Sequence, residues 1–200
     1  MSKNFFQKRY TSKFTTIKFT PWKTLISEEI LSTPWMSIYH NLFELPNGKK
    51  NNYYYVHTLG SSLIIPVKDD GKVILIKQYR YLFNDISIEI PCGGIKEGQN
   101  EELAARAELI EETGFDCKKL KKIGQFIPYN GVSDETCHVY VASGLFHVGA
   151  KPDETEQIEV FEASPGDIDR MIEKGKINDG MSIAGWTIGK KYVLKKCGKN

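Results

Sequence analysis

Apolar residues along the chain fall into short runs with the lengths of β-strands. Two of these runs lie in the middle of the sequence, Ser61–Val67 and Val73–Ile76, and the polar turn Asp69–Lys72 separates them. A short polar turn that contains a glycine is typical of a tight connection between paired strands. We therefore predict that the two runs form the core of a mixed sheet.

The region upstream, from about Thr20 to Val56, carries shorter strand-like runs. A turn signal, Pro46–Gly48, lies between Ile38–His40 and Tyr53–Val56, which predicts an antiparallel hairpin. An isolated hairpin is marginally stable and needs a partner surface. We therefore interpret residues 1–56 as an N-terminal tail and β-hairpin dimerisation module, and residues 57–200 as the main domain.

A helix from about Asn100 to Thr113 carries the clearest boundary signals. Asn100 is a suitable N-cap, two glutamates follow it in the first turn, and Gly114 can end the helix. Before it, a strand at Ile86–Ile90 ends at Pro91 and leads into a glycine-rich loop. Further strands and helices are predicted at 137–142, 158–161, 167–173 and 182–196. This order predicts an α/β or α+β fold, with a mixed sheet flanked by helices and preceded by the hairpin module.

Composition narrows the classes of partner. The chain has 200 residues, 40% of them hydrophobic, and its 27 basic residues include only 4 arginines, so an arginine-rich nucleic-acid groove is not expected. No segment is long and apolar enough to span a bilayer, and the N-terminus does not resemble a secretory signal. The four cysteines are scattered and predict neither a zinc site nor a disulfide framework. We expect a cytoplasmic protein without nucleic-acid or membrane partners.

Three glutamates of the predicted helix carry the most informative chemistry. Glu108, Glu111 and Glu112 are three and four positions apart, so they share one helix face and repel one another. Taken alone, such a cluster is more often a solvated face. Here, however, a strand and a glycine-rich loop lead directly into the helix, which favours a site for a hard cation such as Mg²⁺. Mg²⁺ commonly bridges carboxylates to substrate phosphates.

The segment Gly93–Phe115, GGIKEGQNEELAARAELIEETGF, resembles the Nudix box, G-x5-E-x7-R-E-U-x-E-E-x-G-U, in which U is an aliphatic or aromatic residue. The first glycine matches, and so does every defined position from Glu108 to Phe115, including all three glutamates. Two positions depart from the pattern: Gln99 replaces a glutamate and Ala107 replaces the arginine. Arg106 lies roughly on the opposite side of the helix from Glu108 and cannot substitute in place.

The resemblance implies that Mg²⁺ or Mn²⁺ is held by Glu108, Glu111 and Glu112 together with the main-chain carbonyl of Cys92. It also implies that Glu111 and Glu112 are catalytic. In the family, the missing arginine orients the catalytic glutamates by an ion pair. The alternative of Cys92 as a nucleophile is set aside in favour of an ordinary loop residue, because nothing in the sequence pairs it with a base.

Flanking segments resemble those of hydrolases that act on ADP-ribose and other nucleotide sugars. Lys77–Arg80 followed by Ile88–Pro91 resembles their QYR and ELP signatures, which makes Arg80 and Glu89 candidates for substrate binding. Pro128–Glu135 takes the place of their SPG-x-S-D-E segment. Within it, Asn130 stands where many ADP-ribose hydrolases have proline, and it is a third candidate for substrate binding.

The downstream segment Asp153–Val160 resembles the acidic loop that supplies the catalytic base. Glu156 is the first candidate for this base and Glu154 the second, with a solvated carboxylate as the alternative for each.

These resemblances imply metal-dependent cleavage of the diphosphate bond in a nucleoside diphosphate linked to a sugar. The expected substrate is ADP-ribose, with AMP and ribose 5-phosphate as products. GDP-mannose and ADP-glucose are the alternative substrates. A catalytically weakened nucleotide-binding sensor is the alternative function. In this branch the N-terminal module packs across a homodimer, which is the expected assembly. Tyr53–Tyr55 could stack on a purine or serve as strand or dimer contacts.

Overall fold

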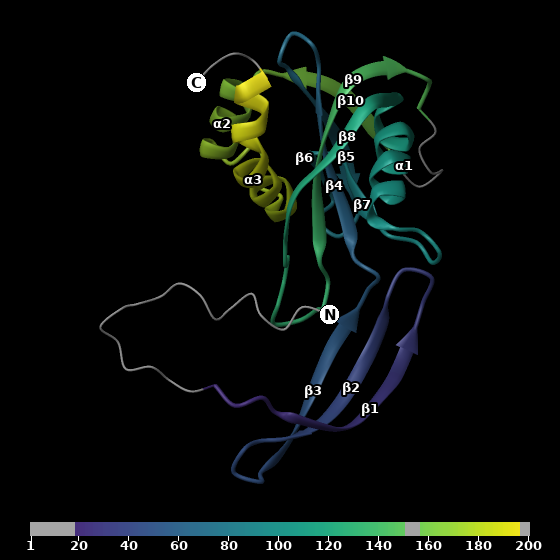
Figure 1. The fold of residues 1–200 in the computed structure, drawn as a ribbon, viewed down its shortest axis with the longest axis vertical. Helices are drawn as coiled ribbons and strands as arrows, with labels where there is room; N and C mark the ends of the chain where they lie inside the picture. Colours follow the sequence, from purple (N-terminus) through teal and green to yellow (C-terminus); the bar gives the residue numbers. More distant parts are fainter. Residues whose placement is uncertain (1–18, 151–156, 197–200) are drawn as a thin grey trace, which may run out of the picture.

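The computed structural model describes residues 19–150 and 157–196, which form two sheets and three helices (Figure 1). The larger sheet has seven strands: β4 (Ser61–Val67), β5 (Val73–Arg80), β6 (Asp85–Glu89), β7 (Cys92–Gly94), β8 (Phe115–Phe126), β9 (Cys137–His147) and β10 (Ile158–Ala163). The order along it is β10-β5-β4-β9-β8, with β6 paired to β5 and β7 paired to β4. The strands β4 and β9 run parallel and the other pairs are antiparallel, so the sheet is mixed, as predicted.

Helices cover both faces of this sheet: α1 (Glu101–Thr113) lies on one side, and α2 (Pro165–Glu173) and α3 (Gly180–Lys196) lie on the other (Figure 1). Buried apolar side chains on both faces of β4 explain why helices cover both sides, because successive side chains of a strand point to opposite faces. Leu63 and Ile65 belong to the cluster that contains Trp186 of α3, whereas Ile64 packs with Leu109 of α1. The expectation of a mixed sheet flanked by helices is confirmed.

The helix α3 approaches β4 closely through two glycines. A Cβ atom on Gly185 would lie 2.6 Å from Leu63 Cδ2, and one on Gly189 would lie 2.1 Å from Ile65 Cδ1. Because real Cβ atoms do not come this close to other heavy atoms, glycine at these positions permits the helix to pack on the strand. No helix among the described residues is long and apolar enough to cross a membrane.

The helix α1 begins and ends at the residues that the sequence predicts. Asn100 Oδ1 accepts a hydrogen bond from Leu103 N at 2.8 Å, so Asn100 is the N-cap. At the other end, Gly114 adopts the left-handed conformation, with φ of 74°, and its N–H donates to Ile110 O. The preceding loop differs from the prediction, because its first three residues pair with β4 as β7.

The N-terminal sheet consists of β1 (Lys23–Ser32), β2 (Ser37–Glu44) and β3 (Lys50–His57), all antiparallel (Figure 1). The strands β2 and β3 form the predicted hairpin, and β1 adds a third strand. Within residues 23–57, Phe43 is the only hydrophobic side chain that is buried. This sheet therefore has almost no core of its own within the chain.

Candidate functional site

The site is organised around α1, whose carboxylates face the glycine-rich loop and β7. Glu112 is buried, with 3% of its surface exposed, and its Oε2 accepts a hydrogen bond from Cys92 N at 3.1 Å. This bond joins the helix to the start of the loop. It also brings the Glu112 carboxylate close to the backbone of the residue whose carbonyl is a predicted metal ligand.

Glu108 lies against Gly93, the first residue of the glycine-rich motif. A Cβ atom at position 93 would be only 2.1 Å from both Cδ and Oε1 of Glu108. The glycine is therefore required by the close approach of a carboxylate, since any larger residue would displace the Glu108 side chain. The helix and the loop meet at this contact.

Glu111 is more exposed than Glu112 and has a cationic neighbour that the sequence analysis did not identify. Lys96 Nζ lies 3.9 Å from Glu111 Oε2. Lys96 belongs to the glycine-rich loop, and its backbone is held by Gln99, whose Oε1 accepts from Lys96 N at 3.1 Å. No local sequence signal pairs this lysine with the glutamate, because the contact depends on how the loop folds back on the helix.

Arg80 and Glu89 form a bidentate ion pair between β5 and β6. Arg80 Nε donates to Glu89 Oε1 at 2.8 Å, and Arg80 Nη2 donates to Glu89 Oε2. The bond to Glu89 is the main reason that the pKa of Arg80 is raised, and the negative charges of Glu112 and Asp179 add to it. The Arg80 guanidinium is thus within electrostatic reach of Glu112, and it remains partly exposed.

Asp179 is a charged residue near Arg80 that the sequence analysis missed. Its Oδ2 accepts from Ser182 N at 2.7 Å, so it caps the N-terminus of α3, and its charge acts on both Arg80 and Cys92. The pair Asp179-Gly180 before an apolar helix is a capping signal that could have been found in the sequence. The proximity of Asp179 to Arg80 could not have been found in the sequence, because it depends on tertiary packing.

The thiol of Cys92 is poorly suited to act as a nucleophile. Its hydrogen bond with Cys137 and its burial raise the pKa of Cys92 well above the usual value for cysteine. A raised pKa keeps the group as a neutral thiol, whereas the thiolate is the reactive form. Cys92 therefore contributes its backbone to this region.

The loop that carries Asn130 is attached to β3 of the N-terminal sheet. Val56 N donates to Val132 O at 2.8 Å, and Tyr53 Oη donates to Gly131 O at 2.9 Å. His57 Nδ1 and Asp134 Oδ2 are 2.7 Å apart. The loop position is therefore set by residues more than 70 positions upstream. The hydroxyl group of Tyr53 thus helps to hold this loop on β3.

The other two tyrosines of the run make ring contacts within the N-terminal sheet. Tyr54 stacks on His40 and Tyr55 stacks on Tyr39, with ring centroids 4.7 Å and 5.6 Å apart. Within the described chain, these side chains therefore serve as strand contacts.

The two candidate bases, Glu154 and Glu156, lie outside the described residues. The residue that follows them, Gln157, is described, and its carbonyl accepts a hydrogen bond from Tyr79 N at 3.3 Å. Tyr79 immediately precedes Arg80. The residue immediately after the two candidate bases is therefore anchored beside Arg80 in the sequence of β5.

The donor set at α1 matches the chemistry of a hard divalent cation. Its members are the carboxylates of Glu108, Glu111 and Glu112 and the backbone around Cys92, and oxygen atoms are the ligands that Mg²⁺ prefers. Within the described ranges, no group of three His, Cys, Asp or Glu side chains is already arranged around one point as a metal site. The residues thus have the right chemistry, and their carboxylates contact the loop backbone and Lys96 instead.

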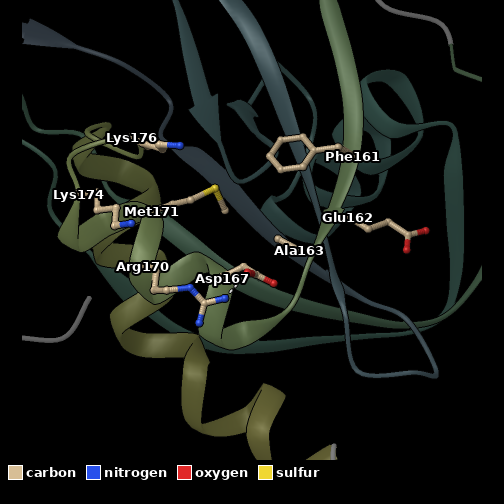
Figure 2. Close-up of a pocket in the computed structure, with 8 residues that line it drawn as sticks. All are labelled: Phe161, Glu162, Ala163, Asp167, Arg170, Met171, Lys174 and Lys176. Carbon is tan, nitrogen blue, oxygen red and sulfur yellow. Dashed lines mark hydrogen bonds and ion pairs between the residues drawn. The ribbon is translucent and has the colours of Figure 1, made fainter.

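A separate hollow of about 330 Å³ lies between β10 and α2 (Figure 2). Its lining is Phe161, Glu162, Ala163, Asp167, Arg170, Met171, Lys174 and Lys176. None of the predicted site residues lines it. Arg170 is directed to Asp167, with which it forms an ion pair (Figure 2). This hollow is therefore distinct from the carboxylate site.

Comparisons with known proteins cover most of the chain, including α1. The NUDIX domain matches residues 57–179. The chain is 36% identical over 159 residues to the ADP-ribose pyrophosphatase of Bacillus subtilis (strain 168), which covers 78% of this chain and 86% of that protein. It is 29% identical over 163 residues to the methanol dehydrogenase activator of Bacillus methanolicus, covering 80% and 88%. It is 27% identical over 170 residues to the GDP-mannose pyrophosphatase of Yersinia pestis, covering 78% and 85%.

Among solved structures, the crystal structure of an ADP compounds hydrolase superposes with a TM-score of 0.80 at 20% sequence identity. The match covers 92% of this chain and 100% of that one. At this level of identity the likeness concerns the fold, and it includes most of both the N-terminal sheet and the larger sheet.

Proposed function

This chain belongs to the Nudix family, and from that premise we propose that it hydrolyses the diphosphate bond of a nucleotide sugar, with ADP-ribose as the first substrate. The products from ADP-ribose are AMP and ribose 5-phosphate. The observation that carries the proposal is the meeting of α1 with the glycine-rich loop. There, Glu112 is buried against Cys92 N, Glu108 lies on Gly93, and Arg80 lies nearby.

Nudix hydrolases generally need a divalent metal ion. Here Glu108, Glu111, Glu112 and the carbonyl of Cys92 would hold Mg²⁺ or Mn²⁺. When bound, the ion neutralises charge on the diphosphate and lowers the pKa of the attacking water. The face of α1 fits this role, because three carboxylates at this spacing repel one another unless positive charge lies close by.

Substrate phosphates are bound in this proposal by Arg80, with Glu89 holding the guanidinium in position. Glu89 is almost fully buried and binds Arg80 in a bidentate manner, which restricts the direction of the guanidinium. Arg80 itself remains about two-fifths exposed, with 42% of its side-chain surface accessible, so it can still contact an anion. The negative charge of Glu112 acts on Arg80, which supports phosphate binding in the neighbourhood of the proposed metal ligands.

Proton removal from the attacking water is assigned to Glu156, with Glu154 as the alternative. The support is the hydrogen bond between Tyr79 and Gln157, since it ties the residue that follows Glu156 to the strand that carries Arg80. A carboxylate just upstream of this anchor can act as general base once substrate is bound. Variants at positions 154 and 156 would separate the two candidates by their effects on turnover.

ADP-ribose is ranked above GDP-mannose and ADP-glucose because the Bacillus subtilis relative is 36% identical, against 27% for the GDP-mannose pyrophosphatase. Asn130 is the position at which specificity could depart from ADP-ribose. It lies in the loop that is fixed to β3, so its place does not depend on the proline that many relatives carry. We therefore expect the loop to be ordered with asparagine at this position.

The protein is further proposed to be a homodimer that uses the N-terminal sheet. This sheet buries only Phe43, while Ile30, Leu31 and Trp35 are half exposed or more. A sheet with exposed apolar side chains of this kind is stabilised when a second surface covers them. Measuring the molar mass of the full chain by sedimentation would test the dimer, and a monomer at micromolar concentration would contradict it. The three described cysteines are all free, which supports the cytoplasm as the compartment.

The function is tested by assaying the full chain with ADP-ribose, GDP-mannose, ADP-glucose and a dinucleoside polyphosphate, each with and without Mg²⁺. We expect the highest specificity constant for ADP-ribose. A leading rate on the dinucleoside polyphosphate, or on a nucleoside triphosphate added to the panel, would refute the nucleotide-sugar assignment. Tight binding of ADP-ribose without turnover would show that the domain is a sensor instead.

A further inference from the structure

The two residues that depart from the Nudix box are Gln99 and Ala107. Each is close in the chain to one partner of the ion pair between Lys96 and Glu111. Ala107 stands where the family has an arginine, and it lies one helical turn before Glu111, so the pair that an arginine would form there is missing. The neighbouring Arg106 is committed elsewhere, because its Nη2 donates to Asp116 Oδ2 at 2.9 Å and to Cys117 O at 3.2 Å. The helix itself therefore supplies no cation to Glu111 from these two positions.

A cation reaches Glu111 from the glycine-rich loop instead. Lys96 Nζ lies 3.9 Å from Glu111 Oε2. The lysine backbone is fixed at both its polar atoms by Gln99: Gln99 Oε1 accepts from Lys96 N at 3.1 Å, and Gln99 N donates to Lys96 O at 3.0 Å. Gln99 is the second residue that departs from the box. A glutamine at this position closes the turn with its amide while adding no negative charge that would compete for the ammonium group.

We propose that Lys96 is a positioning residue which takes over the role of the missing arginine, and that Gln99 holds it in place. This inference rests on the proposed function. Lys96 orients the Glu111 carboxylate toward the metal side of α1 and offsets part of the repulsion among the three glutamates. The Lys96 ammonium group acts through Glu111 and does not contact the substrate.

An ion pair as exposed as this one contributes little to folding stability, because solvent screens it and two flexible side chains must be ordered. Its effect is therefore expected in metal binding and turnover. Partners that orient metal ligands typically change metal affinity or activity by about 10-fold to 100-fold when they are removed. The lower end applies here, since Glu111 is one of several ligands.

The test is a Mn²⁺ titration of the free protein, combined with steady-state kinetics on ADP-ribose. For Lys96→Ala we expect the Mn²⁺ dissociation constant to rise about tenfold and kcat to fall by a similar factor, with KM nearly unchanged. Lys96→Arg should behave like the parent. Lys122→Ala is the matched control, because Lys122 pairs at 3.0 Å with Glu101 of the same helix, about two turns before Glu108.

The direction in which Mn²⁺ affinity changes in Lys96→Ala distinguishes a positioning role from simple charge repulsion between Lys96 and the metal ion. Removing a positive charge beside a cation site should by itself tighten Mn²⁺ binding. Tighter binding in Lys96→Ala would overturn the proposal, and so would an unchanged affinity. Because the titration needs no substrate, it decides the role of Lys96 even if the parent hydrolyses none of the nucleotide sugars and the proposed function fails.

Two double variants complete the experiment. Adding Ala107→Arg to Lys96→Ala should restore most of the lost affinity, because the cation returns on the helix four residues before Glu111. Adding Gln99→Ala to Lys96→Ala should cause no further loss, since Gln99 acts through Lys96. Failure of the arginine to rescue, or fully additive losses for Gln99 and Lys96, would contradict the proposal.

Discussion

Replacing Gly93 by alanine should impair turnover far more than folding. In the structure, a Cβ atom at this position would lie 2.1 Å from Cδ and Oε1 of Glu108. Ordinary contact between such atoms needs about 3.5 Å, so the carboxylate has to move by roughly 1.4 Å. The carboxylate is the far end of a flexible side chain. It can therefore move without disturbing the helix backbone.

The consequence for catalysis follows from the size of this displacement. A misplacement of about 1 Å in a catalytic group can reduce the rate about 100-fold, which corresponds to roughly 2.7 kcal/mol of activation free energy. The loss of folding stability should stay near the low end of the roughly 1–3 kcal/mol that is typical of overpacking. For a chain of this size, about 1 kcal/mol lowers Tm by roughly 2–4 °C.

Measurement of kcat for ADP-ribose at saturating Mg²⁺, together with Tm, would check both expectations. Gly94→Ala is the matched control, because a Cβ atom at position 94 has no heavy atom within 4 Å. It should retain both the activity and the Tm of the parent. If Gly93→Ala keeps activity within about threefold of the parent, Glu108 does not act from the place it occupies here, and the reasoning about the site fails.

Three further predictions concern other parts of the molecule. Glu112→Gln should abolish nearly all Mg²⁺-dependent hydrolysis while Tm holds, and activity within about threefold of the parent would remove α1 as the metal site. Burial alone raises the pKa of Asp169, but hydrogen bonds from Lys190 and Trp186 outweigh it and lower that pKa. Its stabilising effect is therefore present above the ordinary aspartate pKa and lost as pH falls through the lowered value. Asp169→Asn should accordingly reduce the free energy of unfolding at pH 7 by about 1 kcal/mol. A Tm difference between variant and parent that is equal at neutral and acidic pH would contradict this. Deleting residues 20–56 should yield an insoluble or inactive chain, whereas a fully active monomer would rule out the dimerisation module.

Elements with strong local signals were predictable from the sequence. The helix α1 begins at an asparagine and ends at a glycine, so both boundaries are encoded within a few residues. The strand β8 was not predicted, although it has 12 residues. Its Lys118–Lys122 segment places pairs of lysines on both faces and gives no clear alternation, and the strand exists because it pairs with β9. The strand β1 likewise depends on its pairing with β2.

The same contrast applies to the site. The three glutamates could be placed on one helix face from their spacing alone, because that relation is local. The contact of Lys96 with Glu111 and the proximity of Asp179 to Arg80 depend on how separate segments pack, and neither follows from spacing. The hydrogen bond from Cys92 N to Glu112 adds a detail of the same kind, since it couples the loop to the buried end of the helix.

The attachment of the Asn130 loop to β3 has a consequence for chimeric proteins. Val56, Tyr53 and His57 each bond to a residue of this loop, at Val132, Gly131 and Asp134. A graft that exchanges residues 127–136 with those of a relative would leave these upstream groups facing an unrelated backbone. The loop and the end of β3 therefore form a single transplantable unit. Transfer of substrate preference between relatives should require both segments to be moved together.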